Sequence, residues 1–279
     1  MPVAAAELVD SLARFLGPGA LRRAGGSRQE KARSPSERSL SRADSLAQSR
    51  RPAYRCPVDS GRRPSEPGGP TRVALSEGVA AQRSAAPVAL GFRPHTGWAA
   101  MVAVADNGGR VEVVDRRRAA LLDEKLPRQV FHAAAALPAE EAAEMIGRVR
   151  SDACDAAIAV LEEVTGVLGD VLGVGVVAWQ PAVPEGLDQI LASHQLMHAA
   201  EGDLYRGALQ DGADAVGLRV YQFLPADLPA TTAAAVGLTP QVITDELADL
   251  GRRVGPPWQR DQKDATLAAW SVLRFVADR

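Results

Sequence analysis

The sequence predicts an α/β fold in which a mixed five-stranded sheet is flanked by helices. Three apolar runs come first, and Asn107-Gly108-Gly109 separates the second from the third. These residues tolerate the positive φ of a hairpin turn. Further along the chain, the spacing of the apolar residues becomes that of amphipathic helices, which alternate with short buried runs. Hairpin strands followed by alternating helices and strands indicate a mixed sheet covered by helices.

The first three strands are expected to pair in an antiparallel way. Val88–Phe92 is a continuous apolar run suited to a buried strand, and Gly97–Ala105 is the second such run. Arg110–Leu122 forms the third strand, which contains three consecutive arginines at 116–118. We interpret this triplet as a solvated row of charges that protects an edge strand from aggregation.

Helices and buried strands alternate in the second half of the domain. Pro138 and the acids after it open a helix, because proline and negative charge suit a helix N-terminus. Thr239-Pro240 opens another helix in the same way, and Pro256-Pro257 separates it from the last one. The predicted order is β-β-β-α-β-α-β-α-α. The remaining elements are expected at 174–179 (strand), 187–216 (helix), 218–223 (strand) and 261–275 (helix).

Charge divides the chain into two parts. Residues 1–86 hold 15 Lys and Arg against 8 Asp and Glu, whereas residues 87–279 hold 17 against 26. The first part is rich in Ser, Arg, Pro and Gly and lacks apolar periodicity, which predicts a disordered basic segment. We interpret it as a solvated linker or as an extension from an upstream start codon. The alternative is electrostatic contact with nucleic acid.

Several classes of protein are excluded by composition and motif. No apolar run approaches the roughly 18–20 residues of a membrane-spanning helix, so no membrane partner is expected. Two cysteines, Cys56 and Cys154, cannot form a disulfide framework, which fits a cytoplasmic protein. The glycine-rich phosphate loops and the nucleophile elbow of common nucleotide-binding and hydrolase folds are absent from the sequence.

Three stretches resemble the Holliday-junction resolvases of the RuvC type. The stretch 90–99, with Gly91, Arg93-Pro94 and Thr96-Gly97-Trp98, is similar to their opening, in which Gly-x-Asp-Pro-Gly leads into Thr-Gly-aromatic. Residues 200–202 followed by 217–221 resemble their central part, and 261–265 resembles their final Asp-x-x-Asp-Ala. The resemblance runs from about Val88 to Leu273 and implies a ribonuclease H-like fold.

The same resemblance implies that the metal-binding acids are largely missing. That family cuts phosphodiesters with carboxylates that hold divalent metal ions on both sides of the scissile phosphate. Its first-strand acid corresponds to Arg93 and its fourth-strand acid to Ala178 or Trp179, whereas the last-helix acids correspond to Asp261 and Asp264. We therefore expect the fold without the conventional two-metal nuclease.

One group of candidate residues lies around the first turn and the last helix. Arg93, His95 and Thr96 could hold a phosphate or a carboxylate, or they could simply cap a hairpin turn. The segment before the last helix could place charges and an aromatic ring at the rim of a cleft, or form a helix cap with a buried tryptophan. The candidates are Asp261, Asp264 and His95 as catalytic residues, and Arg93, Thr96, Trp258, Arg260 and Lys263 as ligand-binding residues.

A second group lies on one predicted helix. His194, His198 and Glu201 stand at i, i+4 and i+7 on a single helix face and could hold one zinc-like divalent ion. The alternative is a polar helix face on which Glu201 pairs with His198 or Arg206. We interpret His132 as a partly buried structural histidine.

Three functions follow from these candidates. The first is a ribonuclease H-fold protein that binds nucleic acid or another phosphate-containing ligand without cutting it. The second is a metal-dependent hydrolase, either a nuclease or a phosphoesterase. It would use one divalent metal ion held by His194, His198 and Glu201, together with Asp261 or Asp264. The third is a scaffold or oligomerisation protein, and the sequence leaves a homo-oligomer open.

Overall fold

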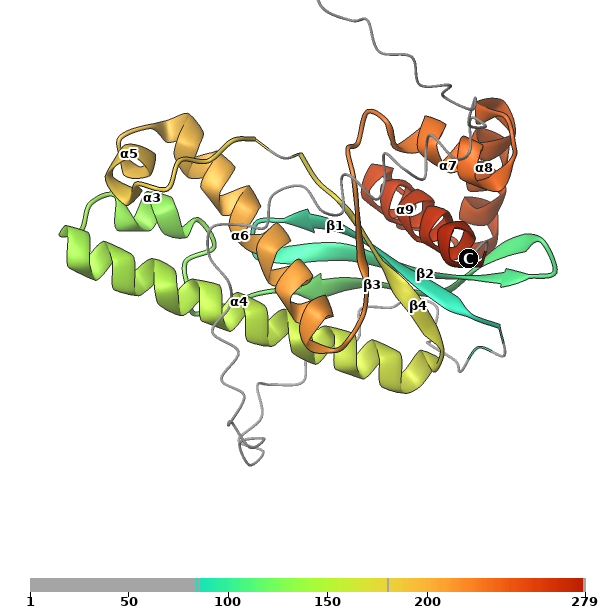
Figure 1. The fold of residues 1–279 in the computed structure, drawn as a ribbon, viewed down its shortest axis with the longest axis horizontal. Coiled ribbons are helices and arrows are strands. Elements are labelled where there is room, and N and C mark those ends of the chain that lie inside the picture. Colours follow the sequence, from blue (N-terminus) through green and yellow to red (C-terminus); the bar gives the residue numbers. More distant parts are fainter. Residues whose placement is uncertain (1–83, 85, 180, 278–279) are drawn as a thin grey trace, which may run out of the picture. The chain divides into compact units, whose positions relative to one another are not determined.

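Five strands form one mixed sheet in the order β3-β2-β1-β4-β5 in the computed structural model, which describes residues 84, 86–179 and 181–277. The first three strands pair in an antiparallel way, and β4 and β5 then extend the sheet in parallel with β1. This arrangement confirms the predicted mixed sheet (Figure 1). The predicted disorder of the basic segment falls almost entirely outside the described residues. The strands are β1 Val88–His95, β2 Trp98–Asn107, β3 Arg110–Ala120, β4 Val171–Val177 and β5 Val220–Phe223.

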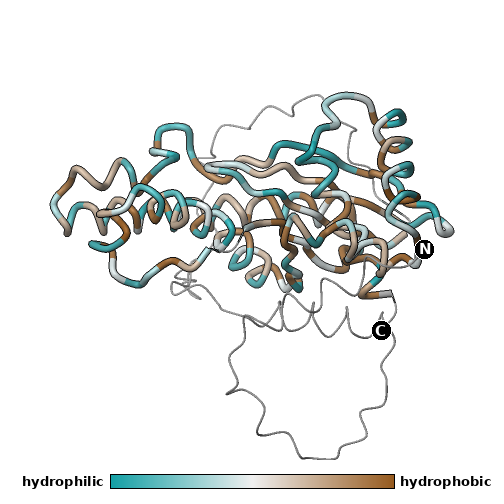
Figure 2. The backbone as a smooth tube through the Cα atoms, turned by 90° about the horizontal axis from the view of Figure 1, so that it is seen from above, coloured by the Kyte–Doolittle hydropathy of each residue, from teal (hydrophilic) through white to brown (hydrophobic). Residues whose placement is uncertain are grey.

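Helices cover both faces of the sheet. The core on one face includes residues of α3, α4 and α6, and the core on the other face includes residues of α7, α8 and α9. Along the coiled stretches of the backbone, hydrophilic and hydrophobic residues are interspersed (Figure 2), as expected for helices that pack on a core with one side. None of the described helices is long and apolar enough to cross a membrane. The helices are α3 Val130–Ala134, α4 Ala139–Leu168, α5 Leu187–Leu191, α6 His194–Ala215, α7 Leu228–Val236, α8 Pro240–Val254 and α9 Arg260–Ala277.

The helices differ from the prediction in three places, the first of which is the short α3, which was not predicted. The single helix expected at 187–216 is two helices, because α5 ends before Ser193 and α6 begins after it. The Ser193 hydroxyl accepts a hydrogen bond from the Leu196 N–H, which caps α6 and makes His194 its first residue. Helix α7 was not predicted at all. Its sequence is almost entirely apolar, so it shows no helical period, and it ends at Gly237, which adopts a left-handed conformation with φ of 69°.

Helix α9 lies directly on the backbone of the sheet because two glycines face it. Gly91 of β1 and Gly175 of β4 are register partners. A Cβ atom at Gly91 would lie 1.8 Å from the Ala265 carbonyl oxygen, and one at Gly175 would lie 2.9 Å from the Ala268 Cβ. Only glycine permits this approach. The approach brings the first turn of α9 to the end of β1.

The arginine triplet of β3 is not a solvated row of charges, and that prediction was wrong. Arg116 is buried and donates hydrogen bonds of 2.7–3.1 Å to the carbonyl oxygens of residues 255–257, just before α9. Arg117 pairs with the buried carboxylate of Asp115 at 2.7 Å. Arg118 lies over the ring of Trp98. The triplet therefore forms internal contacts that a sequence pattern of charges alone does not reveal.

Candidate functional site

The ends of β1 and β4 meet the first turn of α9 through Arg93. Its Nη1 donates a hydrogen bond of 2.9 Å to the carbonyl oxygen of Val177, which is the last residue of β4. Its Nε lies 3.8 Å from Oδ2 of Asp264 on α9. The two strands are parallel, so their carboxyl ends lie at the same edge of the sheet, where α/β proteins commonly bind ligands. Arg93 therefore links three elements at this edge.

A contact between a histidine and a carboxylate lies beside the Arg93–Asp264 pair. His95, at the end of β1, places Nε2 2.9 Å from Oδ2 of Asp261. The same imidazole is stacked on Trp98, with ring centroids 4.3 Å apart and planes only 8° from parallel. The guanidinium carbon of Arg118 lies 4.0 Å from the Trp98 ring centroid. We call Arg93, His95, Asp261 and Asp264 the ion-paired edge.

Burial leaves polar atoms of the ion-paired edge without hydrogen bonds. Burial raises the pKa of Asp264, while the nearby guanidinium groups of Arg93 and Arg260 oppose this rise. Nε of Arg93 and Oδ2 of Asp264 are buried and lack hydrogen-bond partners, because their separation exceeds hydrogen-bonding distance. Nε2 of His95 is close enough to Asp261, but the pair is not aligned for a hydrogen bond. These three atoms therefore lack the hydrogen bonds that buried polar groups usually make.

Exposed side chains surround the ion-paired edge. The Nε of Arg260, whose side chain is 77% exposed, lies 3.7 Å from Oδ2 of Asp264. Lys263 is exposed on the same turn of α9. Trp179, which follows β4 two residues after Val177, is 71% exposed. Thr96 lies in the turn between β1 and β2 and is half-buried.

The contacts of Trp258 are close to the second alternative given for this segment, a tryptophan packed inside the protein before the last helix. Its indole N–H donates a hydrogen bond of 2.8 Å to the Leu247 carbonyl oxygen. A Cβ atom at Gly251 would lie 2.3 Å from the Trp258 ring, so the ring covers this glycine of α8. The contacts of Trp258 therefore attach the segment before α9 to α8.

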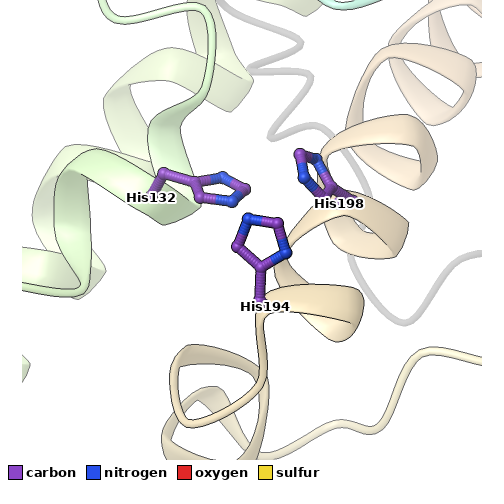
Figure 3. Close-up of side chains that lie close together, drawn as sticks. All are labelled: His132, His194 and His198. Atoms are coloured by element: carbon purple, nitrogen blue, oxygen red, sulfur yellow. The ribbon is translucent and has the colours of Figure 1, made fainter.

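Three histidines converge between α3 and the start of α6, which belong to the helices on the side of the sheet opposite α9. His132 comes from α3, and His194 and His198 come from the first turns of α6. The ring centroids are 4.5–5.0 Å apart. One ring nitrogen from each residue lies within 4.8 Å of the others. Figure 3 shows the three rings turned toward one another. We call these residues the histidine cluster.

Glu201 contacts two residues of the histidine cluster, His132 and His198. The side chain is 2% exposed, and its Oε1 lies 2.8 Å from Nδ1 of His132. Its Oε2 lies 3.6 Å from Nδ1 of His198. Arg206, the other partner considered from the sequence, pairs with Asp203 instead. The pairing with His132 was not foreseen, because 69 residues separate it from Glu201 and only the packing of α3 on α6 brings them together.

The predicted site residues therefore divide into two groups. Asp261 and Asp264 contact β1 from α9, and α9 packs on one face of the sheet. His194, His198 and Glu201 lie on α6, which packs on the opposite face. The structure does not bring the two groups together as one metal centre.

Comparison with models of known protein families and with curated proteins finds no match. Among solved structures, the chain is similar to RuvC of Thermus thermophilus, with a TM-score of 0.42 and 16% identity over 68% of this chain and 96% of that one. For T. thermophilus RuvC in complex with a Holliday junction substrate, the TM-score is 0.41 and the identity 15%, over 66% and 91% of the two chains. For the yeast mitochondrial Holliday junction resolvase Ydc2, the values are 0.40 and 9%, over 68% and 80%.

Proposed function

We propose that this protein binds nucleic acid at the ion-paired edge and does not cut it by two-metal chemistry. The observation that carries the proposal is the position of Arg93. Its guanidinium stands at the end of β1, hydrogen-bonded to the Val177 carbonyl oxygen and close to Asp264. The sequence resemblance assigns a metal-binding carboxylate to this same position.

The donors at this edge do not fit a pair of magnesium ions. Magnesium requires oxygen ligands in near-octahedral geometry, and a two-metal site holds its ions on both sides of the phosphate. Among the residues of the ion-paired edge, only Asp261 and Asp264 are carboxylates, and both lie on one helix turn. A guanidinium 3.8 Å from Asp264 would repel a metal ion bound there. These features support binding rather than hydrolysis.

Local charge and exposure support a nucleic-acid ligand. Residues 87–279 carry 17 Lys and Arg against 26 Asp and Glu. At the edge the balance is reversed, because Arg93 and Arg260 lie 3.8 and 3.7 Å from Asp264 and the exposed Lys263 is on the same turn of α9, which gives three cations against two acids. Exposed cations bind phosphates, and a tryptophan as exposed as Trp179 offers a face on which a base can stack.

Fluorescence anisotropy of labelled single-stranded, duplex and four-way DNA tests the proposal on the full chain. We expect weaker binding by the double variant Arg260→Ala/Lys263→Ala, with the slope of log K against log salt reduced by about 2. Trp179→Ala should weaken single-strand binding at every salt concentration. Arg252→Ala is the matched control, because Arg252 is 71% exposed on α8 and pairs with Asp249. Equal affinity in all four proteins would contradict the proposal.

Cleavage and the basic segment need separate measurements. Incubation of each DNA with the protein and Mg²⁺ or Mn²⁺ should leave the DNA intact. Cutting that disappears in Asp261→Asn or Asp264→Asn would refute the absence of two-metal chemistry.

Residues 1–86 carry a net charge of +7 (15 minus 8) and could bind DNA without the edge. A chain that lacks residues 1–83 should keep the effect of the Arg260→Ala/Lys263→Ala substitution on its remaining affinity.

A further inference from the structure

We propose that His132, His194 and His198 bind one divalent transition-metal ion of the zinc class, and that Glu201 positions two of these imidazoles. The site lies on the opposite face of the sheet from the ion-paired edge and is independent of nucleic-acid binding. Its ligand set replaces Glu201 of the sequence-based metal site with His132.

The state of His132 favours a metal ligand. Glu201 lies 2.8 Å from Nδ1 of His132, which suits an Nδ1–H that donates to the carboxylate; in that tautomer of the neutral imidazole, Nε2 is the atom with a free lone pair. This Nε2 atom is buried and has no hydrogen-bond partner. A buried acceptor without a partner costs free energy, and a metal ion would satisfy it. The other two rings of the histidine cluster converge on the same place (Figure 3).

The spacing of the donors is within reach of tetrahedral coordination. One nitrogen from each ring already lies within 4.8 Å of the others. Zinc–nitrogen bonds of about 2.0–2.1 Å bring tetrahedral donors to about 3.3 Å from one another. His194 and His198 are four residues apart on one helix face and are both exposed, so side-chain rotation can close the remaining gap without moving α6.

Glu201 has the position of a carboxylate that orients metal-bound imidazoles. Its two oxygens face the Nδ1 atoms of His132 and His198, which leaves the Nε2 atoms of both rings for the ion. Such carboxylates fix the tautomer of a metal-binding histidine and raise its basicity. Glu201 is itself 2% exposed, and a dication one imidazole away would compensate its buried negative charge.

The donor set also indicates the class of metal and the openness of the site. Three imidazoles suit zinc, cobalt, nickel or copper rather than magnesium or calcium. Three protein ligands with an open fourth position are typical of catalytic zinc sites, whereas structural sites have four. The His198 side chain is 50% exposed, so the fourth position faces solvent and can hold water or an exchangeable ligand.

Metal binding by the full chain, purified without a histidine tag, tests the proposal. After removal of bound metal, titration calorimetry with Zn²⁺ should give one tight site per chain. We expect His132→Ala and His194→Ala to weaken it at least 100-fold, and Glu201→Gln to weaken it about 10–100-fold. His95→Ala is the matched control, because His95 is the fourth histidine of the chain and pairs with Asp261. It should change the affinity less than twofold.

Zinc affinity in His132→Ala equal to that of the unmodified chain would overturn the proposal, as would the absence of a tight site. If the alanine variants fail to fold, the visible absorption spectrum of Co²⁺ bound to the unmodified chain tests the coordination of the metal instead. We expect the intense visible absorption of four-coordinate cobalt, and we expect azide to shift it by binding at the open position. The weak absorption of six-coordinate cobalt would refute the site. DNA affinity measured on His132→Ala keeps this result separate from the proposed function, because it should not change.

Discussion

Arg93 donates a hydrogen bond to the Val177 carbonyl oxygen and so connects two parallel strands through a side chain from one and the backbone of the other. The same guanidinium faces Asp264. We expect Arg93→Met to lower the free energy of unfolding by about 1–3 kcal/mol, because a carbonyl and a half-buried carboxylate lose their partner. Urea denaturation measures this loss. Arg252→Met, on an exposed arginine, should stay within about 0.5 kcal/mol of the unmodified chain.

A double variant separates the ion pair from the hydrogen bond to Val177. Asp264→Asn removes the carboxylate that Arg93 faces. If the two side chains interact, the double variant Arg93→Met/Asp264→Asn loses less free energy of unfolding than the two single variants lose together. Strict additivity would mean that Arg93 acts through the Val177 carbonyl oxygen alone.

The pH dependence of stability should carry a contribution from Asp264. Burial raises its pKa above the ordinary value of 3.8, so the folded chain keeps the proton to a higher pH than the unfolded chain. The contribution of Asp264 to stability is therefore fully present below pH 3.8 and is lost as the pH rises through the folded-state pKa. As the pH rises from 3.8 through the folded-state pKa, the Tm of the unmodified chain minus the Tm of Asp264→Asn should fall. An increase of this Tm difference with pH would contradict the raised pKa of Asp264.

Two glycine substitutions should have opposite effects. Gly91→Ala would place its Cβ atom 1.8 Å from the Ala265 carbonyl oxygen, so α9 has to move and the loss should exceed about 3 kcal/mol. Gly202→Ala, on the exposed side of α6, meets no atom within 4 Å and should stabilise the chain by about 0.5–1 kcal/mol. Thermal unfolding monitored by circular dichroism distinguishes the two, and equal Tm shifts would argue against the close approach of α9.

The position of His132 should depend on Tyr205. The buried Tyr205 hydroxyl donates a hydrogen bond of 2.8 Å to the Arg128 carbonyl oxygen, four residues before His132. Tyr205→Phe removes this bond and should cost about 0.5–1.5 kcal/mol. If the bond also holds α3 in place, zinc affinity falls in the same variant. Thr244→Val, which removes an exposed hydroxyl on α8, serves as the control for a simple loss of stability.

The sequence predicts the sheet better than the helices that cover it. Strand pairing follows from signals within a few residues, such as Asn107-Gly108-Gly109 between two apolar runs. Helix α7 lacks a periodic pattern because nearly all of its side chains are apolar. The break before α6 depends on a single serine, Ser193, whose role as a cap is indistinguishable in sequence from that of any serine within a helix.

The site residues divide in the same way. His194, His198 and Glu201 could be found because a helix repeats every 3.6 residues. His132 could not, since its relation to Glu201 comes from the packing of α3 against α6. Arg116 was misread for a similar reason, because the carbonyl oxygens that receive its hydrogen bonds lie 139–141 residues away.

The glycine pair beneath α9 also matters for engineering. Main-chain atoms at Gly91 and Gly175 set how closely α9 can approach the strands, whereas the side chains at positions 93, 95, 261 and 264 add contacts near the start of the helix. Exchanging those side chains should leave the geometry of their attachment points intact. The backbone at this edge should therefore tolerate new side chains. Acids placed at positions 93 and 95 offer a direct way to build metal-dependent nuclease activity into a chain that we propose lacks this activity.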